Sequence, residues 1–117
     1  MGETERRRGA PRVAQPFMVR YRRNATAPWR LATLKDLSRE GVRFVCEEVF
    51  ESGEVLELQF GLPLFLQPTQ IVGRIAWKRP VFSGRLQMTE YGLCFTSLPA
   101  DVRQTLDDAM QRFVKHH

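Results

Sequence analysis

Residues 36–46, DLSREGVRFVC, form the stretch that decides the fold, because they join two predicted β-strands through a short polar turn. Asp36 and Ser38 stand two residues apart, so they share one face of an extended segment. Gly41 permits a turn with positive φ, or the close approach of a ligand, before the chain continues. The alternation typical of a half-buried strand then begins, with apolar side chains at Val42, Phe44 and Cys46.

Five further runs outside this stretch have the same period of two. They are marked by Phe17, Val19 and Tyr21; by Trp29, Leu31 and Thr33; by Leu56, Leu58 and Phe60; by Ile71, Gly73, Ile75 and Trp77; and by Tyr91, Leu93 and Phe95. Residues 61–68 and 79–89 are expected to be loops or irregular excursions between strands. Six short strands at a spacing of roughly 10–15 residues are typical of a small antiparallel barrel.

The period changes near the C-terminus, where apolar residues recur on one face of a helix. These residues are Val102, Leu106, Ala109, Met110 and Phe113. Pro99 suits the first helical position, and Asp101 places a negative charge at the positive end of the helix dipole. The predicted fold is therefore mostly β, a six-stranded antiparallel barrel over residues 17–117 with a C-terminal helix at about residues 99–115.

The surplus positive charge of the chain lies at its N-terminus. Residues 1–23 contain seven arginines and two glutamates, whereas residues 24–117 contain 11 basic and 11 acidic residues, so the first segment holds the whole formal charge of +5. Residues 1–16, MGETERRRGAPRVAQP, have no sustained apolar periodicity, which predicts a flexible arginine-rich arm. A protein that binds nucleic acid without specificity would spread such charge over a face of the domain, whereas this chain concentrates it at one terminus.

The sequence lacks the residues that several classes of function require. No histidine lies within residues 1–115, and His116 and His117 at the end of the chain make a poor ligand set. Cys46 and Cys94 belong to no CxxC pattern and are predicted to be buried thiols. We therefore expect no enzyme activity, no cofactor and no metal site.

The sequence also lacks the signals that direct a chain to a membrane. No run approaches the ~18 consecutive apolar residues of a membrane span. The N-terminus carries charge but no apolar core of a signal peptide. These features favour a cytoplasmic protein without membrane insertion.

The arm contains an RRxxxR pattern, formed by Arg7, Arg8 and Arg12. Each guanidinium presents a planar fork of donors that can pair with a phosphate or with the O6/N7 edge of guanine. The same pattern also fits a solvated basic tail that binds polyanions without specificity.

The DxSxxG pattern formed by Asp36, Ser38 and Gly41 offers complementary chemistry. The Asp36 carboxylate can accept hydrogen bonds from the N1–H and the N2 amino group of guanine, and the Ser38 hydroxyl adds a short contact. A plain polar turn that ends in glycine is the alternative interpretation of this pattern.

An arginine arm followed by a small barrel with a DxSxxG turn resembles the PilZ domain family of bacterial cyclic di-GMP receptors. Residues 73–77, GRIAW, and residues 91–95, YGLCF, resemble that family's fifth and sixth barrel strands. The resemblance implies a stand-alone receptor whose arm wraps cyclic di-GMP against the barrel. The RRxxxR arginines would hold phosphates and guanines, the DxSxxG residues would form the opposite wall, and binding would be relayed to an unidentified downstream protein.

Trp77 has two interpretations at this point. Its alternation with Ile71 and Ile75 indicates a core residue, whereas the family resemblance implies a stacking platform beside the ligand. Two other functions also stay open, namely a small barrel that binds nucleic acid through its basic arm and a protein-interaction module that binds no nucleotide. The neutral body of the domain offers no basic stripe, which disfavours nucleic acid.

Overall fold

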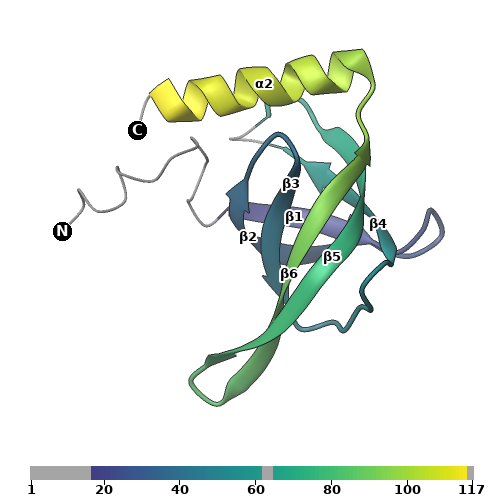
Figure 1. Cartoon of the computed structure of the whole chain (residues 1–117), viewed down its shortest axis with the longest axis vertical. Coiled ribbons are helices and arrows are strands. Elements are labelled where there is room, and N and C mark those ends of the chain that lie inside the picture. The colour runs from purple at the N-terminus through teal and green to yellow at the C-terminus, as the bar shows by residue number, and fades with distance from the viewer. Residues whose placement is uncertain (1–16, 62–64, 116–117) are drawn as a thin grey trace.

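The computed structural model describes residues 17–61 and 65–115 and shows six strands closed into a barrel (Figure 1). The strands are β1 (Phe17–Arg22), β2 (Arg30–Leu37), β3 (Gly41–Cys46), β4 (Val55–Phe60), β5 (Thr69–Ser83) and β6 (Leu86–Ser97). Their order around the barrel is β1-β2-β3-β6-β5-β4, and β4 closes it by pairing with β1. Every pair of neighbouring strands is antiparallel. The predicted fold class is confirmed.

The barrel interior is filled by the inward faces of the strands. Leu34, Leu58 and Ile75 are at most 1% exposed, as the period of two in the sequence predicted. Four aromatic rings pack together inside, with neighbouring centroids between 5.3 and 6.2 Å apart. These rings belong to Tyr21, Phe44, Phe50 and Tyr91. Their burial supplies much of the apolar area that stabilises so small a barrel.

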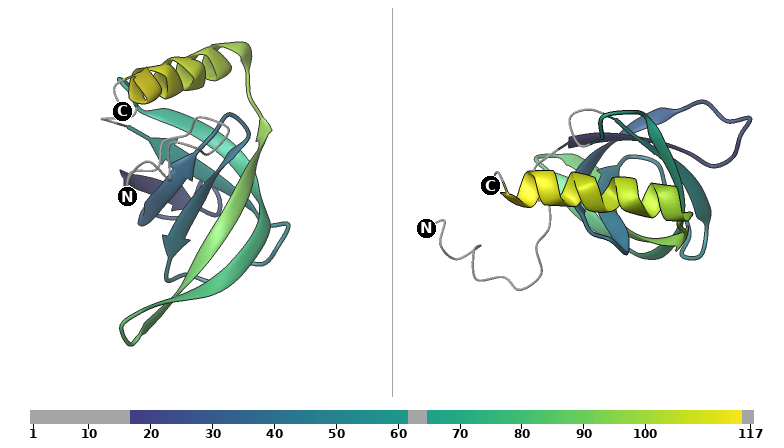
Figure 2. Two further views of the ribbon diagram at one scale, coloured as in Figure 1. Left: turned by 60° about the vertical axis from the view of Figure 1, so that its left-hand side comes forward. Right: turned by 90° about the horizontal axis from the view of Figure 1, so that it is seen from above.

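Helix α2 (Ala100–Lys115) lies across one end of the barrel, as the view from above shows (Figure 2). Leu106, Ala109 and Met110 of this helix belong to the buried core, which confirms the predicted helical face at these positions. The helix begins one residue later than predicted, because the Pro99 carbonyl already accepts the first helical hydrogen bond from the N–H of Arg103. Within the described residues, no helix has the length and hydropathy needed to cross a membrane.

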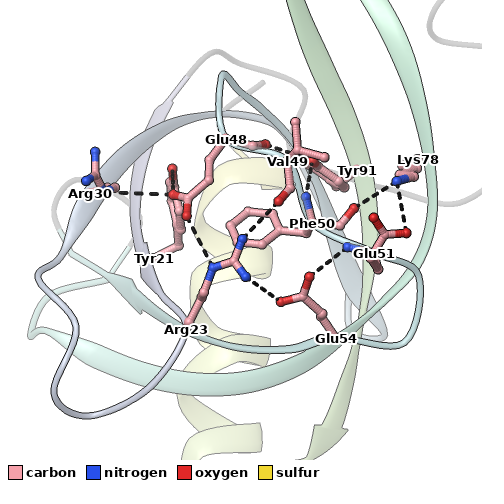
Figure 3. Close-up of polar contacts among 10 residues, drawn as sticks. All are labelled: Tyr21, Arg23, Arg30, Glu48, Val49, Phe50, Glu51, Glu54, Lys78 and Tyr91. Carbon is pink, nitrogen blue, oxygen red and sulfur yellow. Dashed lines mark hydrogen bonds and ion pairs between the residues drawn. The ribbon is translucent and has the colours of Figure 1, made fainter.

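The loop of residues 47–54 closes the other end of the barrel (Figure 3). Phe50 of this loop is fully buried. The Tyr91 hydroxyl donates to the Glu48 carbonyl and accepts from the N–H of Phe50, both at 2.8 Å. Because a buried polar group without a partner costs about 1–3 kcal/mol, this hydroxyl holds the loop backbone in one arrangement.

Arg23 secures the same loop from the end of β1 (Figure 3). Its guanidinium donates to the carboxylates of Glu48 and Glu54 and to the Val49 carbonyl, at 3.2, 2.8 and 2.9 Å. The same group lies 4.6 Å from the ring centroid of Phe50. Arg23 therefore has a structural role at this end of the barrel.

The prediction of a loop at residues 79–89 is wrong, because these residues form most of a β-hairpin between β5 and β6. The paired backbone continues to Ser83 and Leu86, and Gly84 adopts a φ of 64° in the turn. This hairpin projects past the barrel wall (Figure 1), and its Phe82 is 70% exposed. Since the barrel buries neither face of the projecting part, its sequence lacks the alternation that reveals the other strands.

Two predicted burial patterns also differ from the structure. Leu31 is 60% exposed, because β2 turns Ala32 and Leu34 inward and the neighbouring positions outward. Cys94 is exposed although a buried thiol was expected, since it lies between the inward positions of β6. Cys46 is buried as predicted.

The close approach of β3 to β6 can be tested at Gly41. A methyl group there would overlap the carbonyl oxygen of Leu93. Gly41→Ala should therefore lower the free energy of unfolding by about 2 kcal/mol, as overpacking does. Gly61→Ala is the matched control, because its methyl would meet nothing within 4 Å. Urea unfolding measures the difference, and equal stability of the two variants would contradict the close approach.

The buried thiol of Cys46 predicts a loss of stability at alkaline pH. Burial raises the pKa of this thiol, so the unfolded chain loses the proton first as the pH rises above about 8.5. The free energy of unfolding should then fall with a slope of up to about 1.4 kcal/mol per pH unit from this group. Unfolding of Cys46→Ala between pH 8 and 9.5 should show a flatter profile. Cys94→Ala controls for the loss of a thiol, and identical slopes in all three proteins would refute the prediction.

Candidate functional site

A row of four residues crosses the outer face of four adjacent strands. Asp36 pairs with Arg43, Arg43 pairs with Gly92, and Gly92 pairs with Trp77, from β2, β3, β6 and β5 in turn. We call these four residues the site row. Since they are neighbours in register, Asp36 and Trp77 belong to one continuous surface although 41 positions separate them in the sequence.

Two β-bulges turn the ends of the site row outward. The register shifts between Leu34 and Asp36 in β2, and again between Ile75 and Trp77 in β5. Each shift inserts one extra residue, so the side chain after the bulge points to the face opposite to that expected from simple alternation. Leu34 and Ile75 therefore stay in the core, whereas Asp36 and Trp77 lie on the outer face of the sheet, where Asp36 is only 8% exposed and Trp77 is 40% exposed.

Trp77 lies on the bare backbone of β6. A Cβ atom added at Gly92 would overlap the indole ring, so only glycine leaves room for the ring at this position. The side chain is not part of the core, because the residue remains 40% exposed. The interpretation of Trp77 as a core residue is wrong, and the bulge in β5 is the reason. Its role as a stacking platform stays a prediction.

Two carboxylates and two arginines surround this platform. Arg43 donates through Nε to Asp36 and through Nη1 to Glu90, both at 3.0 Å. Arg79 places Nε and Nη2 each 2.8 Å from Oε1 of Glu90. The guanidinium of Arg79 also lies 6.0 Å from the ring centroid of Trp77. The four charges balance, so this part of the surface carries hydrogen-bonding groups but no net charge.

Sequence reasoning missed three members of this cluster, namely Arg43, Glu90 and Arg79. Arg43 had a detectable signal, because it alternates with the inward residues of β3 directly after the DxSxxG turn. Arg79 had none, since it lies in the segment of residues 79–89 that was expected to be irregular, and Glu90 falls between that segment and the predicted strand that begins at Tyr91.

The DxSxxG turn is held by its own hydrogen bonds. The Ser38 N–H donates to the Gly41 carbonyl at 2.9 Å, and the Ser38 hydroxyl accepts from the N–H of Glu40 at 3.2 Å. Of the two roles considered for Gly41, the positive φ does not occur, since among the described glycines only Gly53 and Gly84 adopt one. Gly41 is needed instead because the backbone of β6 passes beside it.

Two grooves lie on the outer surface of the described residues, and none of the four site-row residues lines either of them. One, of about 540 Å³, lies between the DxSxxG turn, the end of β6 and α2, where Arg39 and Asp107 form an ion pair at 2.9 Å. Another, of about 710 Å³, is lined by Met18, Leu31 and Met88 among others and runs over the outer faces of β1, β2 and β3.

The structure brings part of the predicted site together. Asp36, Ser38 and Gly41 stand side by side at the β2–β3 junction, and Trp77 lies in the same row as Asp36. The arm arginines lie outside the described residues; they are Arg7, Arg8 and Arg12. In the described ranges, no three His, Cys, Asp or Glu side chains group as metal ligands would.

Comparisons with known proteins agree with this fold. The cyclic di-GMP-bound PilZ domain of YcgR from Escherichia coli is similar at a TM-score of 0.66 and 16% identity, over 94% of this chain and 93% of that one. The MrkH–cyclic di-GMP complex of K. pneumonia is similar at 0.73 and 12%, over 94% and 53%. The Bacillus subtilis inhibitor of motility, MotI, is similar at 0.62 and 21%, over 91% and 51%.

The chain thus spans about half the length of MrkH and of MotI. At these identities the likeness shows the fold alone, and no curated protein sequence matches the chain. A sequence model of the PilZ domain, however, matches residues 6–112. Because this match covers most of the chain, the protein belongs to the PilZ domain family.

Proposed function

We propose that this protein is a receptor for cyclic di-GMP, which binds between the DxSxxG wall of the barrel and the RRxxxR arginines. The observation that carries the proposal is the site row, which joins a carboxylate and an exposed indole on one outer face. Family membership, and the cyclic di-GMP present with the PilZ domain of YcgR, support the same ligand.

The two ends of the site row offer a guanine base two kinds of contact, a hydrogen-bonding carboxylate and an aromatic ring for stacking. Asp36 accepts from Arg43 at 3.0 Å, and a carboxylate is the kind of acceptor that the N1–H and N2 amino groups of guanine can pair with. The exposed ring of Trp77 offers a π-face on which a base can stack, a contact that contributes about 1–3 kcal/mol. Ser38 and Gly41 are assigned to the same wall because they belong to the turn that follows Asp36.

The phosphates require cations from elsewhere. Cyclic di-GMP carries two phosphodiester charges, whereas the acids and arginines around the platform balance each other. The surplus charge of the protein lies in residues 1–23. We therefore assign the phosphates, and the Hoogsteen edges of the guanines, to Arg7, Arg8 and Arg12.

The pairing of β1 beside the DxSxxG turn supports this assignment of the arginines. Phe17 pairs with Leu34, which lies two residues before Asp36 in β2. Arg12 precedes Phe17 by five residues, a span of at most roughly 18 Å in an extended chain. The RRxxxR segment can therefore reach the site row without a change in the barrel.

Binding in this way links the N-terminal segment to the barrel wall, and this change is the signal that we assign to the receptor. A downstream protein would read the new surface, so the protein acts as a cytoplasmic adaptor and not as an enzyme. Holding a dozen residues in one conformation costs on the order of 12 kcal/mol of backbone entropy. Since each charge-assisted bond contributes about 1.5–3 kcal/mol, several must form together.

The arm contribution can be tested with a pair of arginine variants. Arg8→Ala should weaken binding of cyclic di-GMP at least tenfold, because closure needs several charge-assisted bonds at once. Arg20→Ala removes an exposed arginine of β1 and should leave the affinity nearly unchanged. Isothermal titration calorimetry measures both. No heat from the folded wild-type protein at tens of micromolar ligand, or equal losses in the two variants, would refute the proposal.

The stacking role of Trp77 can be measured separately. In a Trp29→Phe background Trp77 is the only tryptophan, and its fluorescence should change on addition of cyclic di-GMP. Gly92→Ala should displace the indole and lower the affinity about tenfold, as loss of one stacking contact would. Gly61→Ala serves again as the matched control. Unchanged fluorescence at saturating ligand would exclude Trp77 from the binding surface.

A further inference from the structure

The hairpin between β5 and β6 continues past the end of β3, where its strands pair only with each other among the described strands (Figure 1). The last pair between β3 and β6 is Cys46 with Thr89, whereas β5 and β6 stay paired to Ser83 and Leu86. The ribbon therefore extends roughly 10 Å beyond the end of β3. A two-stranded hairpin is only marginally stable in water unless it packs against a further surface. Its outer face is thus a candidate for contact with another molecule.

The outer face of this hairpin combines apolar side chains with one free cation. Val81 and Met88 pair directly, and Leu86 lies on the same face, two residues along β6. Leu86 is 50% exposed. Arg85 in the turn is exposed and forms no ion pair with any residue that the structure describes. Because residues 79–89 contain no acidic residue, nothing in this segment neutralises the charge of Arg85.

The groove of about 710 Å³ begins at the base of the same hairpin, where Met88 is one of its lining residues. Met18, Leu31 and Val45 line it as well, and the first two are 54% and 60% exposed. Methionine side chains adapt readily to the shape of an apolar partner. Glu47 also lines the groove and is exposed, and it has no ion pair within the described part of the chain. The groove is therefore apolar with one free carboxylate.

We infer that this face is a dimer interface, in which the hairpin of each copy of the chain lies in the groove of the other. The inference goes beyond the proposed function and does not depend on it. Hairpin and groove share Met88, so a two-fold axis close to this residue would bring the outer face of each hairpin onto the groove of the second copy. Such a contact is reciprocal, and it closes at two copies.

Charge complementarity selects a second copy as the occupant of the groove. The free carboxylate of Glu47 lies in the groove, and the free guanidinium of Arg85 lies at the tip of the hairpin. In the two-fold arrangement the Arg85 of each copy faces the Glu47 of the other, so the same ion pair forms twice. The apolar side chains of both surfaces are covered by the same movement, and each surface supplies the charge that the other lacks.

The backbone of the hairpin favours a contact through side chains over the addition of a strand. Beyond Arg74, the printed register gives β5 no partner except β6, so this part of β5 is an edge strand among the described residues. Pro80 lies within it and has no N–H to donate. Proline in an edge strand is a common protection against pairing with another chain. We therefore place the contact on the outer face and not along the edge.

Charge reversal tests the interface in the whole chain. Sedimentation equilibrium between about 1 and about 300 micromolar protein should show a monomer–dimer equilibrium. Glu47→Arg and Arg85→Glu should each weaken the dimer at least about tenfold, because each variant sets like charges against each other twice. An equimolar mixture of the two variants should recover the dimer, since both contacts of a mixed dimer again join opposite charges. Both residues are exposed, so the variants should fold.

A pair of leucine variants tests the apolar part of the interface. Leu31→Ser should weaken the dimer about tenfold. Leu66→Ser is the matched control, because Leu66 is 72% exposed but does not line the groove, and it should leave the dimer unchanged. Wild-type protein that stays monomeric over the whole concentration range would overturn the inference and leave the groove to a different partner. A dimer that persists in both charge variants, or a mixture that stays monomeric, would overturn it as well.

Discussion

The pairing of β3 with β6 is the contact on which both the barrel and the candidate site depend. It joins residues 41–46 to residues 89–94, segments that are far apart in the sequence. The two backbones come so close that Gly41 has no room for a side chain beside Leu93. The same pairing places Arg43 between carboxylates of the neighbouring strands and opposite Gly92, which β6 also pairs with Trp77 of β5. Without it, the barrel would open, and the two halves of the site row would lie at opposite edges of one sheet.

The surplus positive charge of the protein and the wall of its candidate site lie in different parts of the chain. The barrel wall offers hydrogen-bonding groups and an aromatic surface, but its acids and arginines cancel. The surplus of positive charge lies in residues 1–23. A neutral wall cannot hold a dianion by itself, and an arginine segment alone has no base selectivity. The function proposed for this PilZ domain requires both parts to meet on one ligand.

The ends of the barrel give the wall its rigidity. Helix α2 covers one end with apolar side chains, and the loop of residues 47–54 fills the other with Phe50. Tyr91 and Arg23 hold that loop through its backbone carbonyls and amides. Because both ends are closed, the side wall between them keeps its register, which a site built from four strands needs.

Local patterns in the sequence determined the six strands, the helix and the two motifs, because periods of 2 and 3.6 report burial within one unbroken element. The face of Trp77, the exposure of Cys94, the hairpin at residues 79–89 and the partners of Glu90 were decided only by the tertiary structure. A bulge reverses the face of the residues that follow it in a strand, and it is defined only by the pairing of that strand with its partner. The sequence thus determined which residues alternate, whereas strand pairing decided which of them meet.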